Sequence, residues 1–306
     1  MAEKTLIVVT GPTGSGKTRL SIDLARRLGC EIISADSRQL FKALPIGTAA
    51  PDADELAAAR HHFVGCLELE DYYSAARFET DVMALLPELF SRSDYAILCG
   101  GSMLYVDAVT NGIDELPTIS EEVRKEAYGL LEKKGIEGVR QRLEELDPVY
   151  YGQVDQNNHK RLVHAVEICL EAGRPYSELR TGARKTRGFK VMKFAIAYER
   201  EELFRRINLR VEDMVEHGLL DEARSVIGKR RLNSLNTVGY KEMFRYLDGE
   251  WDLATAVARL QKNTRVFAKK QLTWLKKDDS VLWLDAHCED LAGEVISRLE
   301  AAKNGI

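Results

Sequence analysis

A glycine-rich stretch near the start of the chain constrains the fold more than any other feature of the sequence. Residues 11–18 read GPTGSGKT and match G-x-x-x-x-G-K-[ST], the pattern of a phosphate-binding loop. The β-branched run TLIVVT at 5–10 precedes it, and residues 17–28 place leucine and alanine side chains on one helical face. A buried strand, a glycine-rich turn and a helix in this order predict a parallel α/β sheet with an anion site at its carboxyl edge.

Each residue type in this loop has a physical role in holding a polyphosphate. Glycines let backbone N–H groups turn inward around the anion, and the start of the helix adds a positive dipole. Lys17 adds a charge for the outer phosphates, and the Thr18 hydroxyl is suited to ligate Mg²⁺. The residues predicted to bind the polyphosphate are Gly11, Pro12, Thr13, Gly14, Ser15, Gly16, Lys17 and Thr18.

The remaining pattern predicts one sheet interrupted by helices. Short apolar runs at 31–34 and 95–99 are further strands, and two more follow at 191–198 and 281–285. Between 116 and 190 helical periodicity dominates. We therefore expect an α/β fold, a P-loop-type parallel sheet core flanked by helices, with an all-helical insertion domain. Residues 1–115 and 191–306 would form the catalytic core with its C-terminal helices, and 116–190 the insertion.

Composition excludes several classes of protein. The five cysteines are scattered without a CxxC pair, which argues against structural zinc and a disulfide framework and favours a reducing, cytoplasmic location. No apolar run approaches the roughly 20 residues that a membrane span needs. The net charge of −4 argues against a globally basic nucleic-acid binder, although it leaves local basic patches open.

The acid that follows the second strand is the strongest candidate for acid–base chemistry. P-loop kinases and NTPases usually place a metal-binding Asp at a strand end, but the strand at 95–99 ends in Gly-Gly-Ser. Asp36, in SADSRQ at 34–39, is the only acid directly after an early strand. It suits a general base or a metal ligand, which is the interpretation that we favour, and it also suits a helix N-cap.

Taken together, the motifs resemble the tRNA dimethylallyltransferases, which prenylate an adenosine next to the anticodon. The resemblance covers most of the chain in the family's order. It is carried by GPTGSGKT (11–18), SADSRQLFKALPIGTAAP (34–51), HHF (61–63), YSAARF (73–78), GGSMLYVDAVTNGIDELP (100–117), VDQNNHKRLVHAVE (154–167), the segment 199–222, TVGYKEM (237–243) and TRVFAKKQLTWLKK (264–277).

The resemblance implies a specific reaction and specific roles. A dimethylallyl group would pass from dimethylallyl diphosphate to N6 of the adenosine 3′-adjacent to the anticodon, in tRNAs that read U-starting codons, with release of pyrophosphate. The loop would hold the diphosphate rather than a nucleotide. Asp36 would accept the amine proton. The leaving group would be stabilised by Lys17, by Thr18 as the protein ligand of Mg²⁺, and by Arg206 and Arg210, which lie four residues apart on one helical face.

The resemblance also implies contacts with the tRNA anticodon stem-loop. The expected tRNA-binding residues are Asp36, Ser37, Arg38, Gln39, Ser102, Arg124, Asn158, His159, Lys160, Arg161, Lys262, Arg265 and Lys269. Gln39 is of a type that reads a base edge through two hydrogen bonds, and Ser102 also suits a helix N-cap. The sequence departs from the family at Gln156, where proline is common, and at His164, where arginine is common.

Two basic stretches indicate where RNA would lie. Residues 180–193 hold six basic side chains and no acid, and residues 258–277 hold seven and no acid. Lys262, Arg265, Lys269 and Lys276 share a helical face, which suits a phosphate backbone. A single charge run is usually a solvated helix face, but two of them in an acidic chain are more informative.

Other readings remain open from the sequence. A P-loop small-molecule kinase would bind ATP and turn it over, and a non-catalytic nucleotide-dependent RNA-binding module would not need Asp36. A prenyltransferase acting on free AMP or ATP would not need the basic carboxyl-terminal helices or the insertion. We expect a monomer.

Overall fold

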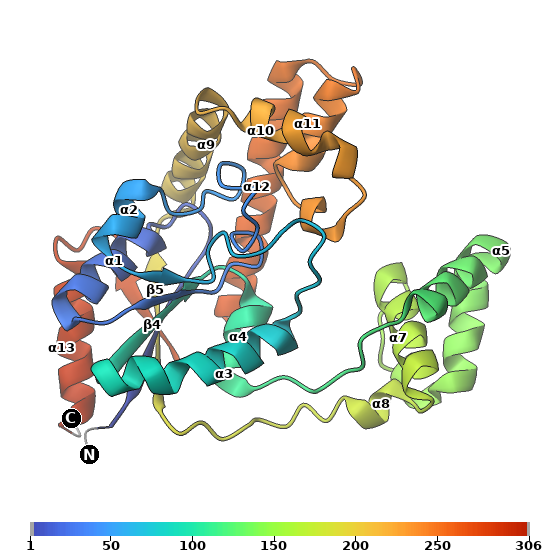
Figure 1. Ribbon diagram of the computed structural model, residues 1–306, viewed down its shortest axis with the longest axis horizontal. Coiled ribbons are helices and arrows are strands. Elements are labelled where there is room, and N and C mark those ends of the chain that lie inside the picture. Colours follow the sequence, from blue (N-terminus) through green and yellow to red (C-terminus); the bar gives the residue numbers. More distant parts are fainter. Residues whose placement is uncertain (1–2, 305–306) are drawn as a thin grey trace. The chain divides into compact units, whose positions relative to one another are not determined.

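The sheet of this computed structural model, which describes residues 3–304, is six-stranded and entirely parallel. Its spatial order is β3-β2-β4-β1-β5-β6. Figure 1 shows β4 and β5 of this sheet with helices around them. The strands are β1 (Thr5–Thr10), β2 (Ile32–Ser34), β3 (His61–His62), β4 (Tyr95–Gly100), β5 (Lys190–Ala197) and β6 (Val281–Asp285). Because all strands run the same way, their carboxyl ends share one edge, where α/β proteins bind ligands.

β1 occupies the centre of the sheet because its side chains are apolar on both faces. It pairs with β4 on one side and with β5 on the other, over its full length. Leu6, Ile7, Val8 and Val9 are fully buried. A strand buried on both faces reads as a continuous β-branched run, and this is the pattern of TLIVVT.

Helices cover the sheet, and further helices lie beyond its carboxyl edge. α1 (Lys17–Leu28) ends at Gly29, whose φ of 59° and N–H bond to the Ala25 carbonyl give a left-handed cap. The other helices of this unit are α2 (Ala53–Ala58), α3 (Ala75–Arg92), α4 (Met103–Asn111), α9 (Arg200–Glu216), α10 (Leu219–Val226), α11 (Tyr240–Leu247), α12 (Leu253–Leu275) and α13 (Leu291–Lys303), with 3₁₀ turns at Ile227–Lys229 and Asn233–Leu235.

A separate apolar cluster holds α9 to α12 together beside the 41–46 segment. Tyr240, Met243 and Leu219 are fully buried there, and Phe41 and Leu44 join them from the first part of the chain. This cluster therefore fixes the C-terminal helices against residues that follow β2, and the site described below depends on it.

The second unit comprises residues 111–185, whereas the sequence pattern led us to expect 116–190. It contains α5 (Glu121–Leu146), α6 (Pro148–Tyr151), α7 (His159–Ala172) and α8 (Tyr176–Leu179), with no strand among its residues. Gly135, at φ 65° and ψ −168°, breaks α5 into two helices. α5 and α7 bury Leu143, Leu162 and Val166 in a core of their own.

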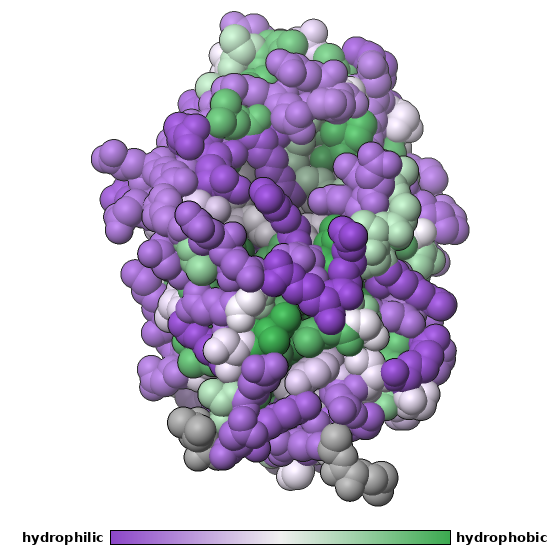
Figure 2. Space-filling model, turned by 90° about the vertical axis from the view of Figure 1, so that its left-hand side faces the viewer, coloured by the Kyte–Doolittle hydropathy of each residue, from purple (hydrophilic) through white to green (hydrophobic). Residues whose placement is uncertain are grey.

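The fold class matches the expectation from the sequence: a parallel sheet with flanking helices. The helix at 17–28 and the strand at 281–285 have the expected bounds, and β4 and β5 lie within one residue of theirs. Among the described residues, none of the helices is both long enough and apolar enough to span a bilayer. The face shown in Figure 2 is mostly hydrophilic, with hydrophobic side chains in small groups.

Candidate active site

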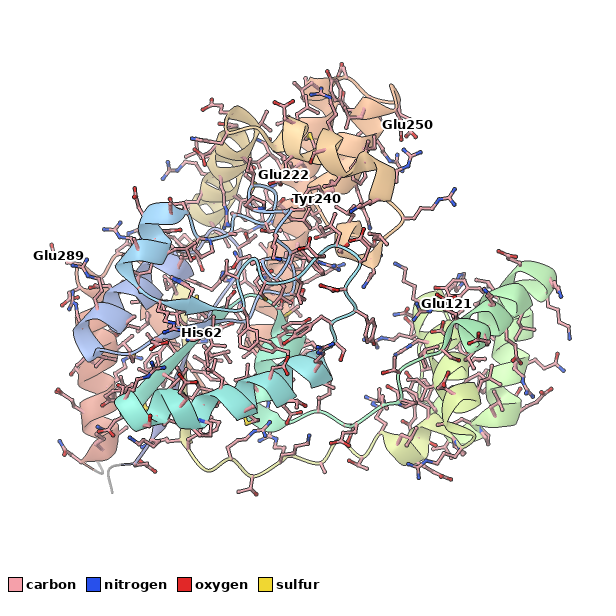
Figure 3. The ribbon with its side chains drawn as sticks, in the orientation of Figure 1. His62, Glu121, Glu222, Tyr240, Glu250 and Glu289 are labelled. Carbon is pink, nitrogen blue, oxygen red and sulfur yellow. The ribbon has the colours of Figure 1, made fainter. Side chains whose placement is uncertain are left out.

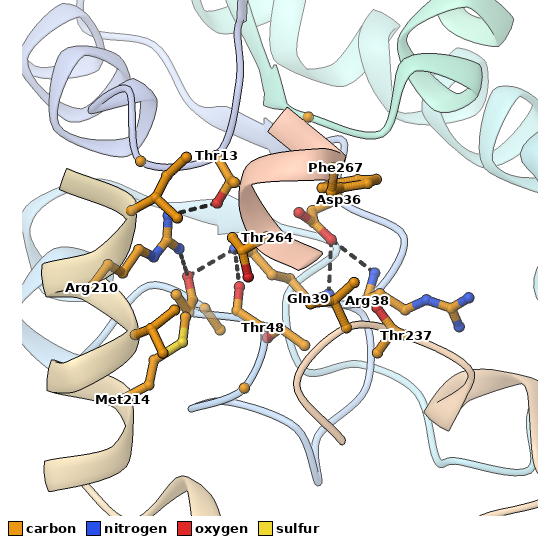
Figure 4. Close-up of a pocket in the computed structure, with 18 of the residues that line it drawn as sticks. Thr13, Asp36, Arg38, Gln39, Thr48, Arg210, Met214, Thr237, Thr264 and Phe267 are labelled. Atoms are coloured by element: carbon orange, nitrogen blue, oxygen red, sulfur yellow. Dashed lines mark hydrogen bonds between the residues drawn. The ribbon is translucent and has the colours of Figure 1, made fainter. Parts of the chain in front are cut away.

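A pocket of about 960 Å³ in the sheet-containing unit opens at the carboxyl edge of the sheet (Figure 4). One wall is formed by the turns that follow β1, β2 and β4, and the other by α9, α12 and the segment that precedes α11. The first wall comes from residues 13–102 and the second from residues 206–271. The fold therefore brings distant parts of the chain around one cavity.

The 11–18 loop adopts the conformation that an anion site needs. Gly11, Gly14 and Gly16 all have positive φ, at 147°, 80° and 86°, which side chains rarely allow. The Lys17 ammonium donates to the Pro12 carbonyl at 2.9 Å. Burial lowers the pKa of Lys17 from 10.5 to about 8, and the positive charge of Arg210 also lowers it while Asp36 opposes the shift. An anion bound in the loop would restore the ammonium's preference for the charged form.

Two arginines of α9 reach the same loop, one turn apart. Arg206 Nε donates to the Gly14 carbonyl at 2.9 Å, and its guanidinium lies over the Tyr198 ring, 4.8 Å from the centroid. Arg210 Nη1 donates to the Thr13 hydroxyl at 3.2 Å (Figure 4). Burial lowers the pKa of Arg210, although guanidinium remains charged at neutral pH. Both arginines line the pocket, so three cations surround one loop.

Asp36 lies at the pocket, where it also caps a turn. Its Oδ1 accepts the N–H groups of Arg38 at 2.9 Å and of Gln39 at 3.4 Å. Both bonds use one oxygen, and the residue lines the pocket together with Lys17 and Arg210. The capping role and a role in acid–base chemistry are therefore compatible in this geometry.

The Gln39 amide and Nη1 of Arg38 donate hydrogen bonds to backbone carbonyls of the protein itself. Gln39 Nε2 donates to the Ala49 carbonyl at 2.9 Å and more weakly to that of Thr48, while its Oε1 accepts the Ser34 hydroxyl. Arg38 Nη1 donates to the carbonyls of Asn233 and Ser234, and burial lowers its pKa. The expected reading of a base edge by Gln39 does not fit this arrangement, because both ends of its amide already have partners.

Ser102 does not use its hydroxyl as a helix cap. Its Oγ accepts the Ser37 N–H at 2.9 Å and donates to the Ser37 hydroxyl at 3.2 Å. The turn after β4 thus lies directly against the turn after β2. Gly100 allows this approach, since a Cβ there would lie 2.2 Å from the Ala35 carbonyl oxygen.

Gln271, in α12, forms hydrogen bonds between the two walls of the pocket. The sequence alone did not indicate it as a site residue. It is 2% exposed. Its Oε1 accepts the Thr13 N–H at 2.9 Å, and its Nε2 donates to the Gly101 carbonyl at 2.8 Å. A buried amide with both ends bonded to backbone fixes the phosphate loop relative to the turn after β4. A glutamine inside a basic helical stretch carries no signal of such a role.

The second wall contains further residues that sequence reasoning left without chemistry. The segments GLLDE (218–222) and TVGYKE (237–242) match the family, and the sequence gives them no chemistry beyond helix packing and backbone contact. The structure gives them defined partners: Glu222 bonds backbone N–H groups at Ile46 and Gly47, and Glu242 accepts from Gly239 N and Asn263 Nδ2. Residues 236–238 and Lys241 line the pocket.

The basic stretches are only partly available to RNA, which corrects the expectation of two free basic surfaces. In 180–193, Arg187 is paired with Glu79 and bonded to the Ala108 carbonyl, and Lys193 is paired with Asp278. Lys193 is buried and the Arg187 side chain is only 10% exposed, so neither is free to meet a phosphate backbone. On α12, Lys262 is exposed, while Arg265 bonds Asn208 and Lys269 lies over the Phe204 ring.

The candidate RNA-binding residues of the 111–185 unit cluster at the start of α7. His159, Lys160 and Arg161 are exposed in its first turn, and Asn158 is its N-cap, accepting the Arg161 N–H. Arg124 Nε and His164 Nδ1 both face the buried Glu167, at 3.8 and 3.4 Å. Gln156 donates to the Tyr151 carbonyl and supports the turn before α7.

The residues at the loop fit a magnesium ion held mainly by a diphosphate. Thr18 lines the pocket, as does Asp36. Mg²⁺ at phosphate sites takes one or two protein oxygens and completes its shell with phosphate and water. Within residues 3–304 there is no cluster of three His, Cys, Asp or Glu side chains that would form an all-protein metal site, and such a cluster is not needed for this mode of binding.

Comparison with known proteins decides the family. The family model described as IPP transferase matches residues 39–278. The chain is 51% identical to tRNA dimethylallyltransferase 2 of Parabacteroides distasonis, covering 91% of this chain and 93% of that protein. It is 48% identical to tRNA dimethylallyltransferase 1 of Bacteroides fragilis, covering 99% of each. The chain belongs to the IPP transferase family.

Solved structures of IPP transferases share the whole fold. The tRNA isopentenylpyrophosphate transferase of Bacillus halodurans has a TM-score of 0.70 and 34% identity, covering 99% of this chain and 97% of that one. A eukaryotic dimethylallyltransferase described as acting on tRNA has a TM-score of 0.80 and 25% identity, covering 98% and 78%. The protein is thus a transferase enzyme of the tRNA dimethylallyltransferase group, as the sequence motifs indicated.

Proposed function

We propose that the protein binds dimethylallyl diphosphate with its diphosphate in the 11–18 loop, and transfers the dimethylallyl group to N6 of a tRNA adenosine in front of Asp36. One observation carries the proposal. Lys17, Arg206 and Arg210 converge on the loop, and Asp36 lines the same pocket. Cations at one place and a carboxylate at another suit a reaction that releases an anion and removes a proton.

Stabilisation of the leaving group would be the main contribution of the loop. In the transfer, the bond from the adenine nitrogen to allylic C1 forms as the C1–O bond breaks, and the electron pair stays on pyrophosphate. Negative charge grows on the diphosphate oxygens. Lys17, the loop N–H groups and the two arginines are in place before the reaction, so they stabilise this charge without reorganisation.

Asp36 would act as the general base. As N6 attacks, the nitrogen becomes cationic and its proton passes to the Asp36 carboxylate. Because Asp36 Oδ1 is fixed by two backbone N–H groups, the side chain is oriented without a substrate. A positioned base contributes typically about 10²- to 10⁴-fold.

We propose Mg²⁺ as the cofactor, held by Thr18 and by the diphosphate. When bound, the ion would neutralise charge on the leaving group. Lys17 and the arginines would bind the remaining diphosphate oxygens.

We propose that the anticodon stem-loop contacts exposed basic side chains of both units. Arg124, His159, Lys160 and Arg161 would serve in the 111–185 unit, and Lys262 and Lys269 on α12. An anticodon loop presents unpaired bases, which a protein can extrude and bind individually. We also propose that the protein acts as a monomer in the cytoplasm.

Transfer of labelled prenyl groups tests the proposed function directly. The protein is incubated with labelled dimethylallyl diphosphate, Mg²⁺ and unmodified tRNA, and nuclease digestion then locates the label. We expect label on one adenosine beside the anticodon and release of one pyrophosphate per transfer. Label that stays out of RNA, while a known tRNA dimethylallyltransferase incorporates it in parallel, would reject the function. Label on free AMP or ATP in preference to tRNA would favour a nucleotide prenyltransferase.

A further inference from the structure

Glu222 of α10 joins donors from two distant parts of the chain. Its Oε2 accepts the Ile46 N–H at 2.8 Å, and its Oε1 accepts both the Gly47 N–H at 2.8 Å and the Tyr240 hydroxyl at 2.6 Å. Figure 3 shows Glu222 and Tyr240 close together. Hydrogen bonds to a carboxylate are stronger than those between neutral groups. One side chain therefore fixes the backbone at residues 46 and 47.

Tyr240 supports this arrangement from behind. The side chain is fully buried. Burial and the negative charge of Glu222 raise the pKa of Tyr240, so its hydroxyl stays protonated and donates to the carboxylate throughout the physiological range. A Cβ on Gly47 would lie 2.6 Å from the ring, so the ring packs directly against the backbone of Gly47. The segment cannot shift toward α11.

The backbone just beyond Gly47 is held in an unfavourable conformation. Ala49 has a φ of 45°, which alanine rarely adopts. Such a residue persists only where its surroundings determine its conformation. Here the Thr48 hydroxyl donates to the Leu44 carbonyl at 2.6 Å, and the Gln39 amide donates to the Ala49 carbonyl at 2.9 Å. Residues 47–50 line the pocket in this conformation.

The same carbonyl connects the segment to the phosphate loop. Arg210 Nη2 lies 3.5 Å from the Ala49 oxygen, and its Nη1 donates to the Thr13 hydroxyl. Ala49 is two residues from Gly47, so a displacement of the 46–47 backbone moves the carbonyl that orients the guanidinium. The contacts form one continuous path from Tyr240 through Glu222 and Ala49 to Arg210.

We propose that Glu222 and Tyr240 are positioning residues for the diphosphate end of the site. They hold the 46–50 segment so that the Ala49 carbonyl and Thr13 fix the Arg210 guanidinium beside the phosphate loop. The identity of the anion as a prenyl diphosphate rests on the proposed function, but the path to Arg210 does not.

A purely stabilising role predicts a different outcome from a positioning role. Loss of stability alone would lower the melting temperature and reduce the active fraction, leaving both KM values unchanged. Loss of position would weaken diphosphate binding and lower kcat/KM for the prenyl donor, without changing KM for tRNA. The weakening of diphosphate binding would also be seen only in proteins that retain Arg210.

Tyr240→Phe is the first variant because it removes one hydroxyl and keeps the ring against Gly47. We expect kcat/KM for dimethylallyl diphosphate to fall about tenfold, the loss of one charge-assisted hydrogen bond acting through position. KM for tRNA should stay within about twofold. Tyr246→Phe makes the same change six residues along α11 and is the matched control, with no expected effect on either substrate. Glu222→Gln is the second variant. Its side-chain NH₂ group would face a backbone N–H where the carboxylate now has an acceptor oxygen, so we expect a larger loss of kcat/KM for dimethylallyl diphosphate.

A double-mutant cycle with Arg210→Ala decides whether the effect passes through that arginine. Binding of inorganic pyrophosphate is measured by calorimetry for the wild type, Tyr240→Phe, Arg210→Ala and the double variant. We expect Tyr240→Phe to weaken binding several-fold in the wild-type background and not at all beside Arg210→Ala. Additive losses, or an unchanged affinity in Tyr240→Phe, would overturn the inference.

The two proposals fail separately in these experiments. If the wild type transfers no prenyl group to tRNA, the proposed function falls, and the pyrophosphate cycle still tests the path to Arg210. If the wild type is active and the cycle is additive, the positioning role falls while the function stands.

Discussion

The two walls of the pocket are built in opposite ways. The 11–18 loop and the turn at Asp36 come from short, contiguous segments that follow neighbouring strands. The opposite wall comes from α9, α12 and the segment before α11, and it contacts the first wall through single side chains such as Arg210 and Gln271. The first wall carries Lys17 and Asp36, whereas the second adds Arg206 and Arg210 and also contains residues such as Gln271 that hold the first wall in place. Substitutions of Lys17 or Asp36 should therefore affect the reaction more than substitutions of supporting residues such as Gln271.

The largest effect is expected at Asp36. Asp36→Asn keeps the oxygen that accepts the Arg38 N–H but cannot take up a proton, so the single-turnover rate should fall about 10²- to 10⁴-fold. The affinity for tRNA, measured by filter binding, should change less than about threefold. A loss of tRNA affinity together with a small loss of rate would show that Asp36 serves the turn rather than the chemistry.

A loss of about 10²- to 10³-fold in kcat/KM for the prenyl donor is expected for Lys17→Met. The lowered pKa of Lys17 shows that its charge is costly to bury, so the apolar variant should keep or raise the melting temperature. Rate and calorimetric stability measured on one preparation test both statements. A variant that loses activity because it unfolds would contradict them.

The pH dependence of kcat/KM for the prenyl donor tests the role of Lys17 without substituting it. Its pKa of about 8 means that the ammonium is charged below pH 8 and increasingly neutral above it. Diphosphate binding needs the charged form, so kcat/KM for the donor should be level up to about pH 8, and then fall by about tenfold for each further pH unit. Lys17→Arg, which stays charged, should remove this decline even if its overall rate is lower. A decline that persists in that variant belongs to another group.

On the second wall, Gln271→Leu should lower kcat/KM for the donor by about fivefold. Leucine fills most of the volume but leaves the Thr13 N–H and the Gly101 carbonyl without their buried partner. Gln271→Glu is the comparison, because it keeps an acceptor for Thr13 and loses the donor to Gly101. An effect as large as that of Lys17→Met would contradict the division between the two walls.

The smallest effect is expected at Lys262, an exposed cation of α12. Lys262→Ala should raise KM for tRNA about twofold at moderate salt, and lower the slope of log affinity against log salt by roughly 0.7 to 0.9, as expected for one phosphate contact. Donor kinetics should not change. An unchanged salt slope would exclude this residue from the RNA surface.

The two walls also differ in how far the sequence predicts them. The loop, its strand and its helix follow from GPTGSGKT and the flanking apolar periodicity, because their interactions lie within a few residues. The placement of Asp36 follows from strand order alone. Gln271 and Glu222 carry no such signal, since their partners lie 258 and 176 residues away. The internal bonds of Gln39 were missed for a different reason: its partners Ser34, Thr48 and Ala49 lie nearby in the sequence, but the irregular backbone that brings them together has no periodic pattern.

The basic stretches show where composition misleads. Arg187 and Lys193 belong to a run without acids in the sequence, yet the fold brings Glu79 and Asp278 to them. The edge strand at His61–His62 was also not predicted, since two residues give no periodicity; there His62 bonds Glu31 at 2.6 Å. The expected tRNA contacts of the 111–185 unit and the magnesium ligand remain predictions.

The two ends of the 111–185 unit lie next to each other, which affects how the enzyme can change during evolution. The Lys185 N–H donates to the Asn111 carbonyl at 2.8 Å, so the excursion begins and ends at neighbouring points. An inserted unit whose first and last residues lie side by side does not strain the unit into which it is inserted. Its helices can lengthen, shorten or be exchanged while the register of β1 and β5 stays the same, so the RNA contacts proposed for this unit can change without altering the phosphate loop.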